Sequence, residues 1–121
     1  ILYTDSVLGK AIDTLKARQT TMNTALIYLS DHGESLGENG VYLHGTPYMF
    51  APEQHTHMPF MFWLSPDYVK NFGVNETCLR DQAAKENVSQ DNLFSTALGM
   101  MNIKSSVYQP QMDILSPCRT S

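Results

Sequence analysis

The sequence of 121 residues lacks several features that would point to other classes of protein. It has no apolar run near the roughly 18 residues of a transmembrane helix, and no basic stretch followed by an apolar stretch at its start. Eight Lys and Arg against twelve Asp and Glu give a net charge of -4, which excludes a broadly basic surface for nucleic acid. G-x-G-x-x-G and Walker motifs are missing, which argues against nucleotide binding.

Cysteine is also scarce. Cys78 and Cys118 are forty residues apart and lack the Cys-x-x-Cys or Cys/His spacing of a structural zinc site. The residues alone leave two interpretations open, namely two unpaired thiols in a reducing compartment or a disulfide in an oxidising one.

Lys and Arg are absent from the whole block between Gln19 and Val69. A local excess of carboxylates and imidazoles without resident cations favours a bound metal ion, whereas the alternative is an acidic loop that faces water. The block contains Asp31, Glu34, Glu38, Glu53, Asp67 and all four histidines, His32, His44, His55 and His57.

Apolar spacing predicts a helix over residues 1–18, and nearly continuous apolar runs predict buried strands at 24–30 and 58–65. A helix followed by a buried strand is half of a βαβ unit, so we expect an α/β fold with a mainly parallel sheet flanked by helices. His55 and His57 are interpreted as polar residues that lead into the second strand.

The rest of the chain is predicted to be less regular. Residues 66–86 are polar and mixed, which favours turns with a short helix, and after Ile103 we expect an irregular tail. Ser89 is the expected N-cap of a helix that ends near Met101. Its predicted apolar side consists of Leu93, Phe94, Ala97, Leu98 and Met101.

Asp31 and His32 lie where the first predicted strand runs into a glycine-containing loop. Neighbouring strand side chains point to opposite faces, so both reach one ion only if the backbone bends, which Gly33 makes easy. Zinc accepts such a mixed oxygen and nitrogen set, and His44 lies twelve residues further on. The alternative interpretation is an Asp and a His that cap a turn through hydrogen bonds.

The segment 28–45, YLSDHGESLGENGVYLHG, closely resembles the lipid A phosphoethanolamine transferases, the family that includes the transferable colistin-resistance enzymes. Eighteen consecutive residues carry this likeness, which makes it highly specific. The resemblance continues through residues 50–54, 59–63 and 89–96, so it covers most of the chain.

The resemblance implies that residues 1–121 are the C-terminal part of a periplasmic, sulfatase-like catalytic domain of the alkaline phosphatase and sulfatase superfamily. The whole protein would then be a bacterial inner-membrane protein whose membrane helices lie upstream. By the same resemblance, Asp31 and His32 would be zinc ligands and Glu34 would line the substrate cavity. His44 would contact the substrate phosphate or a second zinc ion.

The implied activity is zinc-dependent transfer of phosphoethanolamine from phosphatidylethanolamine to a lipid A phosphate, through a threonine that also lies upstream. The 121 residues alone would therefore be inactive. Two alternatives are a related sulfatase or phosphoglycerol transferase, and a noncatalytic binding module of the same fold. The oxidising compartment that the resemblance implies also favours a disulfide between Cys78 and Cys118.

Overall fold

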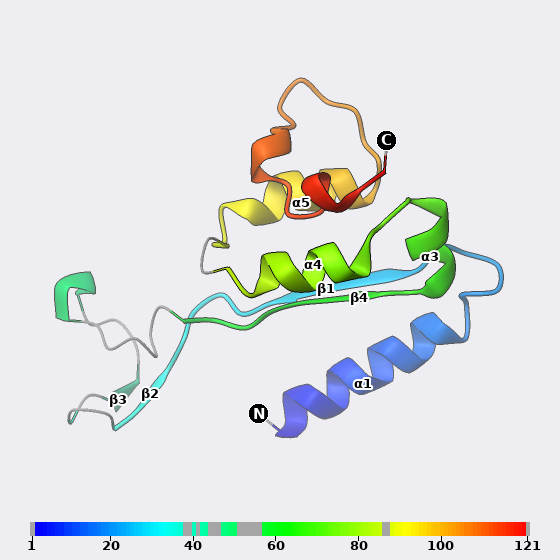
Figure 1. Cartoon of the computed structure of the whole chain (residues 1–121). Helices are drawn as coiled ribbons and strands as arrows, with labels where there is room; N and C mark the ends of the chain where they lie inside the picture. Colours follow the sequence, from blue (N-terminus) through cyan, green and yellow to red (C-terminus); the bar gives the residue numbers. More distant parts are fainter. Residues whose placement is uncertain are drawn as a thin grey trace. The chain divides into compact units, whose positions relative to one another are not determined.

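The computed structural model describes residues 2–37, 40, 42–43, 47–50, 57–85 and 88–120. The chain divides into two compact units, residues 1–25 with 64–121 and residues 26–63. The first unit contains α1 (Leu2–Lys16), α3 (Pro66–Asn71), α4 (Glu76–Ala83), α5 (Asn92–Met100) and the 3-10 helices η3 (Pro110–Met112) and η4 (Ser116–Cys118) (Figure 1). The second contains β2 (Ser35–Leu36), β3 (Tyr42–Leu43), η2 (Tyr48–Phe50) and most of β1 (Ala25–Leu29) and β4 (Phe60–Leu64).

The helix expected at the start of the chain is confirmed as α1. Asp5 in its first turn and Lys16 in its last turn match the sign of the helix dipole at each end. Beyond the helix, the Thr24 hydroxyl donates a hydrogen bond to the Leu15 carbonyl at 3.4 Å, which ties the start of the following strand to the end of α1. Among the helices that the structure describes, α1 included, none has the length and apolar character to cross a membrane.

The two expected strands are confirmed as β1 and β4, which are hydrogen-bonded neighbours. Near the start of β1, Ser65 N–H donates to the Thr24 carbonyl at 2.9 Å, and beyond its end Ser30 N–H donates to the Pro59 carbonyl at 3.3 Å. The start of β1 therefore lies beside the end of β4, so the strands are antiparallel, as are β2 and β3. The mixed α/β character is as expected, but the described strands do not form a mainly parallel sheet. A continuous apolar run indicates that both faces of a strand are covered, but it does not say whether the neighbouring strand is parallel or antiparallel.

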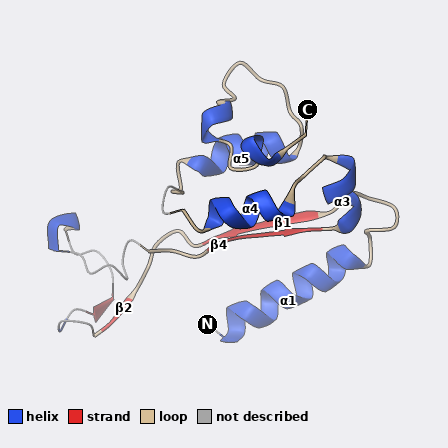
Figure 2. Cartoon of the chain, viewed as in Figure 1, coloured by secondary structure: helices blue, strands red, loops and turns tan. Residues whose placement is uncertain are grey.

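Side-chain caps fix the starts of α3 and α4, two of the helices drawn in blue in Figure 2. The Ser65 hydroxyl accepts a hydrogen bond from Tyr68 N–H at 3.2 Å, and it also accepts one from Thr24 N–H at 3.2 Å. This buried hydroxyl therefore joins the start of β1 to the first turn of α3. At α4, the Asn75 side-chain oxygen accepts a hydrogen bond from Cys78 N–H at 3.0 Å.

The buried hydrophobic side chains of the described residues all belong to the first unit: Tyr68, Val74, Met100, Leu115 and Cys118. The Tyr68 hydroxyl donates to the Met100 carbonyl at 2.7 Å and accepts a hydrogen bond from the Arg119 guanidinium at 3.3 Å. Burial raises the pKa of Tyr68 above its ordinary value, so this hydroxyl remains a protonated donor at neutral pH.

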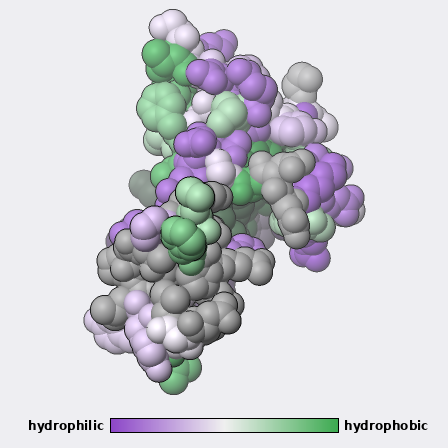
Figure 3. Space-filling model, turned by 90° about the vertical axis from the view of Figure 1, so that its left-hand side faces the viewer, coloured by the Kyte–Doolittle hydropathy of each residue, from purple (hydrophilic) through white to green (hydrophobic). Residues whose placement is uncertain are grey.

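Helix α5 begins later than predicted and buries a different side. It starts at Asn92, and the N-cap position is taken by Asp91, which makes no capping hydrogen bond, so the prediction of Ser89 as N-cap is wrong. Phe94 and Met101, which belong to the predicted apolar side, are 58% and 60% exposed. Figure 3 shows green, hydrophobic side chains at the surface where α5 and the tail lie, at the top of the view. The buried residues of α5 are Ser95, Thr96, Gly99 and Met100.

The tail that follows α5 explains why the helix buries small and polar side chains. The Asn92 amide donates to the Met112 carbonyl at 3.0 Å, and the Thr96 hydroxyl accepts a hydrogen bond from Ile114 N–H at 3.0 Å. Buried backbone groups that have no strand partner need such side-chain partners. Residues 103–120 are irregular in backbone as expected, apart from η3 and η4, but they form a strap that is hydrogen-bonded along the polar side of α5.

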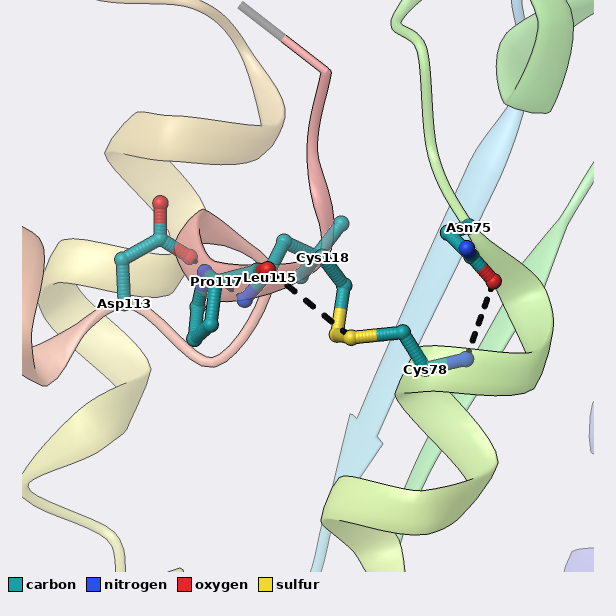
Figure 4. Close-up of a disulfide and its surroundings, with 6 residues drawn as sticks. All are labelled: Asn75, Cys78, Asp113, Leu115, Pro117 and Cys118. Atoms are coloured by element: carbon teal, nitrogen blue, oxygen red, sulfur yellow. Dashed lines mark hydrogen bonds between the residues drawn. A yellow bond between two sulfur atoms is a disulfide. The ribbon is translucent and has the colours of Figure 1, made fainter.

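The two cysteines form a disulfide, with 5.5 Å between their Cα atoms (Figure 4). Cys78 lies on α4, and Cys118 is the last residue of η4. Beside the disulfide, Asn75 N–H donates to the Cys118 carbonyl at 2.8 Å, and Val74 and Arg119 form an isolated antiparallel bridge. The end of the tail is thus held by a covalent bond and by backbone pairing, and the prediction of a disulfide is confirmed.

Gly99 provides a test of how closely the strap packs on α5. A Cβ atom at this position would lie 2.7 Å from the carboxyl carbon of Asp113, a buried residue that accepts hydrogen bonds from Tyr108 Oη at 2.7 Å and Leu115 N–H at 2.9 Å. We expect Gly99→Ala to lower the free energy of unfolding by about 2 kcal/mol, because the carboxylate must move away from these donors. Urea denaturation measures the change.

Gly9 on α1 is the matched control, because nothing lies within 4 Å of a Cβ atom built there. Gly9→Ala should raise the stability by up to about 1 kcal/mol through helix propensity alone. Equal effects of the two substitutions would contradict the close packing of Asp113 on Gly99.

Candidate metal and phosphate site

Asp31 and His32 lie in a bend directly beyond β1. β1 ends at Leu29, and Ser30, the residue before Asp31, donates from its N–H to the Pro59 carbonyl that precedes β4. The Ser30 hydroxyl then donates to the His32 carbonyl at 2.8 Å, and this short side-chain-to-backbone link closes a turn around Asp31. The chain therefore leaves the regular strand at Asp31, as is required for two consecutive side chains to approach one point.

The side chains of Asp31 and His32 do converge. His32 Nε2 lies 3.8 Å from Asp31 Oδ2, and the side chains are 45% and 90% exposed, respectively. The other ring nitrogen, Nδ1, is 2.9 Å from the Gly33 carbonyl. Because a carbonyl oxygen only accepts hydrogen bonds, Nδ1 must be the protonated nitrogen in this contact, and Nε2 carries the lone pair of the neutral imidazole.

The electrostatics of the bend favour positive charge on His32. The pKa of His32 is raised above its ordinary value, first because of the hydrogen bond to the Gly33 carbonyl and further because of the negative charges of Asp31 and Glu34. Partial desolvation acts in the opposite direction. The same carboxylates that attract a proton to this point would attract a metal cation.

The donor set fits part of a zinc site. In a tetrahedral site with bonds near 2.1 Å, two ligand atoms are separated by about 3.4 Å, and the separation of Oδ2 and Nε2 is 3.8 Å. A hydrogen bond from Nδ1 to a backbone carbonyl is also the usual way in which a ligating imidazole is oriented. No group of three or more His, Cys, Asp or Glu side chains that could hold a metal is formed by the described residues. Asp31 and His32 would therefore supply two ligands, and further ligands would come from elsewhere.

Glu34 and His44, the predicted substrate-binding residues, flank the β2–β3 hairpin in the sequence. Glu34 is exposed and immediately precedes β2, and β2 pairs antiparallel with β3 through Ser35 with Leu43 and Leu36 with Tyr42. β3 ends at Leu43, one residue before His44, which itself lies outside the described residues. The structure thus places Glu34 beside the Asp31 and His32 bend but does not describe His44.

Among the other candidates, Glu38, Glu53 and His55 lie outside the described residues, and His57 is exposed just before β4. Sequence reasoning missed Ser30, whose hydroxyl closes the turn that presents Asp31 and His32. A serine at the end of a strand, directly before an Asp and near a glycine, is a known turn-forming residue, and this signal could have identified it.

Comparison with known proteins gives consistent results. A sequence profile of the family described as Sulfatase matches residues 1–103. Phosphoethanolamine transferase EptA of Salmonella typhimurium is 52% identical over 119 residues, which is 98% of this chain and 22% of that protein. The chain spans about a fifth of the length of this curated relative.

Two solved structures are similar. The integral membrane protein lipooligosaccharide phosphoethanolamine transferase A of Neisseria meningitidis has 43% identity and a TM-score of 0.92, with 99% of this chain and 22% of that chain covered. The C-terminal periplasmic domain of phosphoethanolamine transferase EptC of Campylobacter jejuni has 47% identity and a TM-score of 0.80, with 99% of this chain and 36% of that chain covered.

Proposed function

Because the chain belongs to the sulfatase family, we propose that the protein transfers phosphoethanolamine from phosphatidylethanolamine to a phosphate of lipid A, at a zinc site that includes Asp31 and His32. The observation that carries the proposal is the convergence of Asp31 Oδ2 and His32 Nε2 in a chain that is 52% identical to a phosphoethanolamine transferase. A carboxylate and an imidazole at the exit of a strand are suited to hold a metal against a phosphoryl group.

In this proposal Asp31 and His32 hold zinc through Oδ2 and Nε2, and the Gly33 carbonyl keeps the His32 ring in the correct tautomer. When bound, zinc would neutralise charge on the phosphoryl oxygens and make a nearby hydroxyl more acidic. The nucleophile would be a threonine hydroxyl from outside these 121 residues. Its oxygen would bond to phosphorus as the diacylglycerol oxygen leaves, and a lipid A phosphate oxygen would then displace the threonine.

The substrate side of the site is assigned to Glu34 and His44. The exposed Glu34 carboxylate accepts hydrogen bonds only, so it suits the ammonium group of phosphoethanolamine. The imidazole of His44 suits the phosphate, to which it would donate a hydrogen bond.

The proposed location is the periplasmic side of the bacterial inner membrane. The disulfide between Cys78 and Cys118 supports an oxidising compartment. The names of the similar structures describe an integral membrane protein and a periplasmic domain, and any membrane helices of this protein would lie outside the chain described here.

The test is a transfer assay with the intact protein. Phosphatidylethanolamine labelled in its headgroup is incubated with lipid A, and mass spectrometry detects lipid A that has gained one phosphoethanolamine. We expect transfer to be lost on dialysis against a chelator and restored by zinc, because Asp31 and His32 need the cation to act on a phosphoryl group.

Three outcomes would contradict the proposal. One is hydrolysis of sulfate esters without lipid transfer, and another is use of phosphatidylglycerol in place of phosphatidylethanolamine. The third is an intact protein that folds equally well in chelator and contains no zinc, which would indicate a noncatalytic binding module.

A further inference from the structure

We propose that Leu36, Tyr42, Met49 and Phe50 form an apolar rim with which the protein rests on a bilayer surface rich in phosphatidylethanolamine. The rim lies in the same unit as Asp31 and His32. This inference rests on the proposed function, because the lipid donor of that reaction resides in a bilayer, and it adds the surface from which the donor is taken.

The first argument is exposure. Leu36, Tyr42, Met49 and Phe50 are 76%, 69%, 88% and 73% exposed. A single exposed apolar side chain is ordinary, but these four are the large hydrophobic residues exposed in the described part of residues 26–63, and all fall within residues 36–50. Within the described part of this unit, the exposed large apolar side chains therefore all follow the candidate ligands in the sequence.

The hairpin gives half of the rim a defined shape. Leu36 and Tyr42 are directly paired across β2 and β3, so their side chains lie on the same face of the hairpin. The Tyr42 ring packs over Gly37, where a Cβ atom would lie 2.9 Å from the ring carbon that bears the hydroxyl. Gly37 has a φ of 122° and no side chain, so it leaves room for the ring. A tyrosine held with an apolar ring and a polar hydroxyl at the surface is suited to a membrane interface.

The second half of the rim lies on η2. This short 3-10 turn is closed by a hydrogen bond from Phe50 N–H to the Pro47 carbonyl at 2.8 Å. Met49 and Phe50 project from it as a flexible thioether and a rigid aromatic ring. Such side chains insert readily among acyl chains.

Charge selects the kind of bilayer. The sequence has no Lys or Arg between Gln19 and Val69, so the unit that carries the rim contributes neither Lys nor Arg to the binding of anionic lipid. The exposed carboxylate of Glu34 instead complements the ammonium group of phosphatidylethanolamine. The apolar rim therefore suits a zwitterionic bilayer, into which its side chains insert through apolar contacts.

A kinetic experiment separates the rim from the chemistry. The intact protein with Met49→Ser and Phe50→Ser is assayed with long-chain phosphatidylethanolamine in vesicles, and with dihexanoyl phosphatidylethanolamine dissolved as monomers. We expect about a tenfold lower rate on vesicles and an unchanged rate on monomers. Met22→Ser, at a methionine of the other unit that is 63% exposed, is the matched control and should change neither rate. Equal rates of the rim variant and wild type on vesicles would overturn the rim.

A second measurement does not depend on activity or on the stability of the double variant. Benzoylphenylalanine is incorporated at the position of Phe50, or at that of Met22 as control, and the protein in phosphatidylethanolamine vesicles is irradiated. We expect cross-links to phospholipid from the first position and none from the second. Cross-links from position 50 to another part of the protein, or to a second protein, would overturn the rim. Failure of wild type to use either donor would instead contradict the proposed function, while the cross-linking result would still decide on the rim.

Discussion

Asp31→Ala in the intact protein is expected to reduce phosphoethanolamine transfer by at least about a hundredfold, because loss of a residue that merely orients a metal ligand already costs 10- to 100-fold. Asp31 Oδ2 is one of two donor atoms that the described residues bring to the site, 3.8 Å from His32 Nε2. Removing it takes away one of these two donor atoms, and a catalytic zinc site has only about four ligands. The transfer assay and the zinc content of the purified variant measure the two consequences.

The same substitution elsewhere provides the control. Asp81 is an exposed aspartate on α4, outside the unit that contains the site, and Asp81→Ala should leave both transfer and zinc content unchanged. His44→Ala is an informative contrast, since loss of a phosphate contact should slow transfer while zinc is retained. Normal transfer by the Asp31 variant would refute its assignment as a ligand.

Replacing both cysteines with serine is expected to lower the free energy of unfolding by about 4 kcal/mol, from the chain-entropy estimate for a loop with a sequence separation of 40. The loop contains α5, η3 and most of η4, and its ends are the α4 residue Cys78 and the buried Cys118. Without the disulfide, the strap along α5 is held by the hydrogen bond that Asn92 donates, by the one that Thr96 accepts, and by the short pairing of Val74 with Arg119.

Denaturant unfolding with and without a reductant measures this contribution. Wild type should lose a similar amount of stability on reduction, whereas the double variant Cys78→Ser, Cys118→Ser should not respond to the reductant. Unchanged stability of the double variant would show that the noncovalent contacts of the strap are sufficient.

Sequence periodicity was sufficient to locate α1, β1 and β4, because each contains enough apolar residues to set a period or a run. Sequence periodicity could not predict whether β4 runs parallel or antiparallel to β1. The direction depends on which backbone groups meet across the sheet, as in the hydrogen bond from Ser65 to Thr24, and the apolar run carries no information about that choice.

The prediction for α5 failed for a different reason. The prediction placed the large apolar residues of the helix on its buried side. In the structure, the backbone of the tail takes its hydrogen-bond partners from the side of the helix that carries Asn92 and Thr96. Gly99 then allows Asp113 to approach the helix closely. The pattern of hydrophobicity along one segment carries no information about the backbone N–H and C=O groups of a second segment that need hydrogen-bond partners.

The candidate ligands were easier to predict than the turn that presents them. Asp31 and His32 are recognisable by residue type and by their position after a strand. The contribution of Ser30 depends on a hydrogen bond from its hydroxyl to the carbonyl two positions further on, which the residue type alone does not specify. The described residues also do not include a third ligand, since ligands of one metal can come from distant segments.

The position of Ser30 links the candidate ligands to the alignment of two strands. Its N–H bonds to the carbonyl of Pro59 at the entrance to β4, and its hydroxyl shapes the bend that follows. If β4 slid by one residue along β1, side chains would exchange faces and the bend would begin at a different residue. The register of residues 58–64 along β1 thus sets where the bend with the candidate cation ligands begins. Substitutions in this segment that shift the register would therefore disturb the candidate site as well as the packing of the strands.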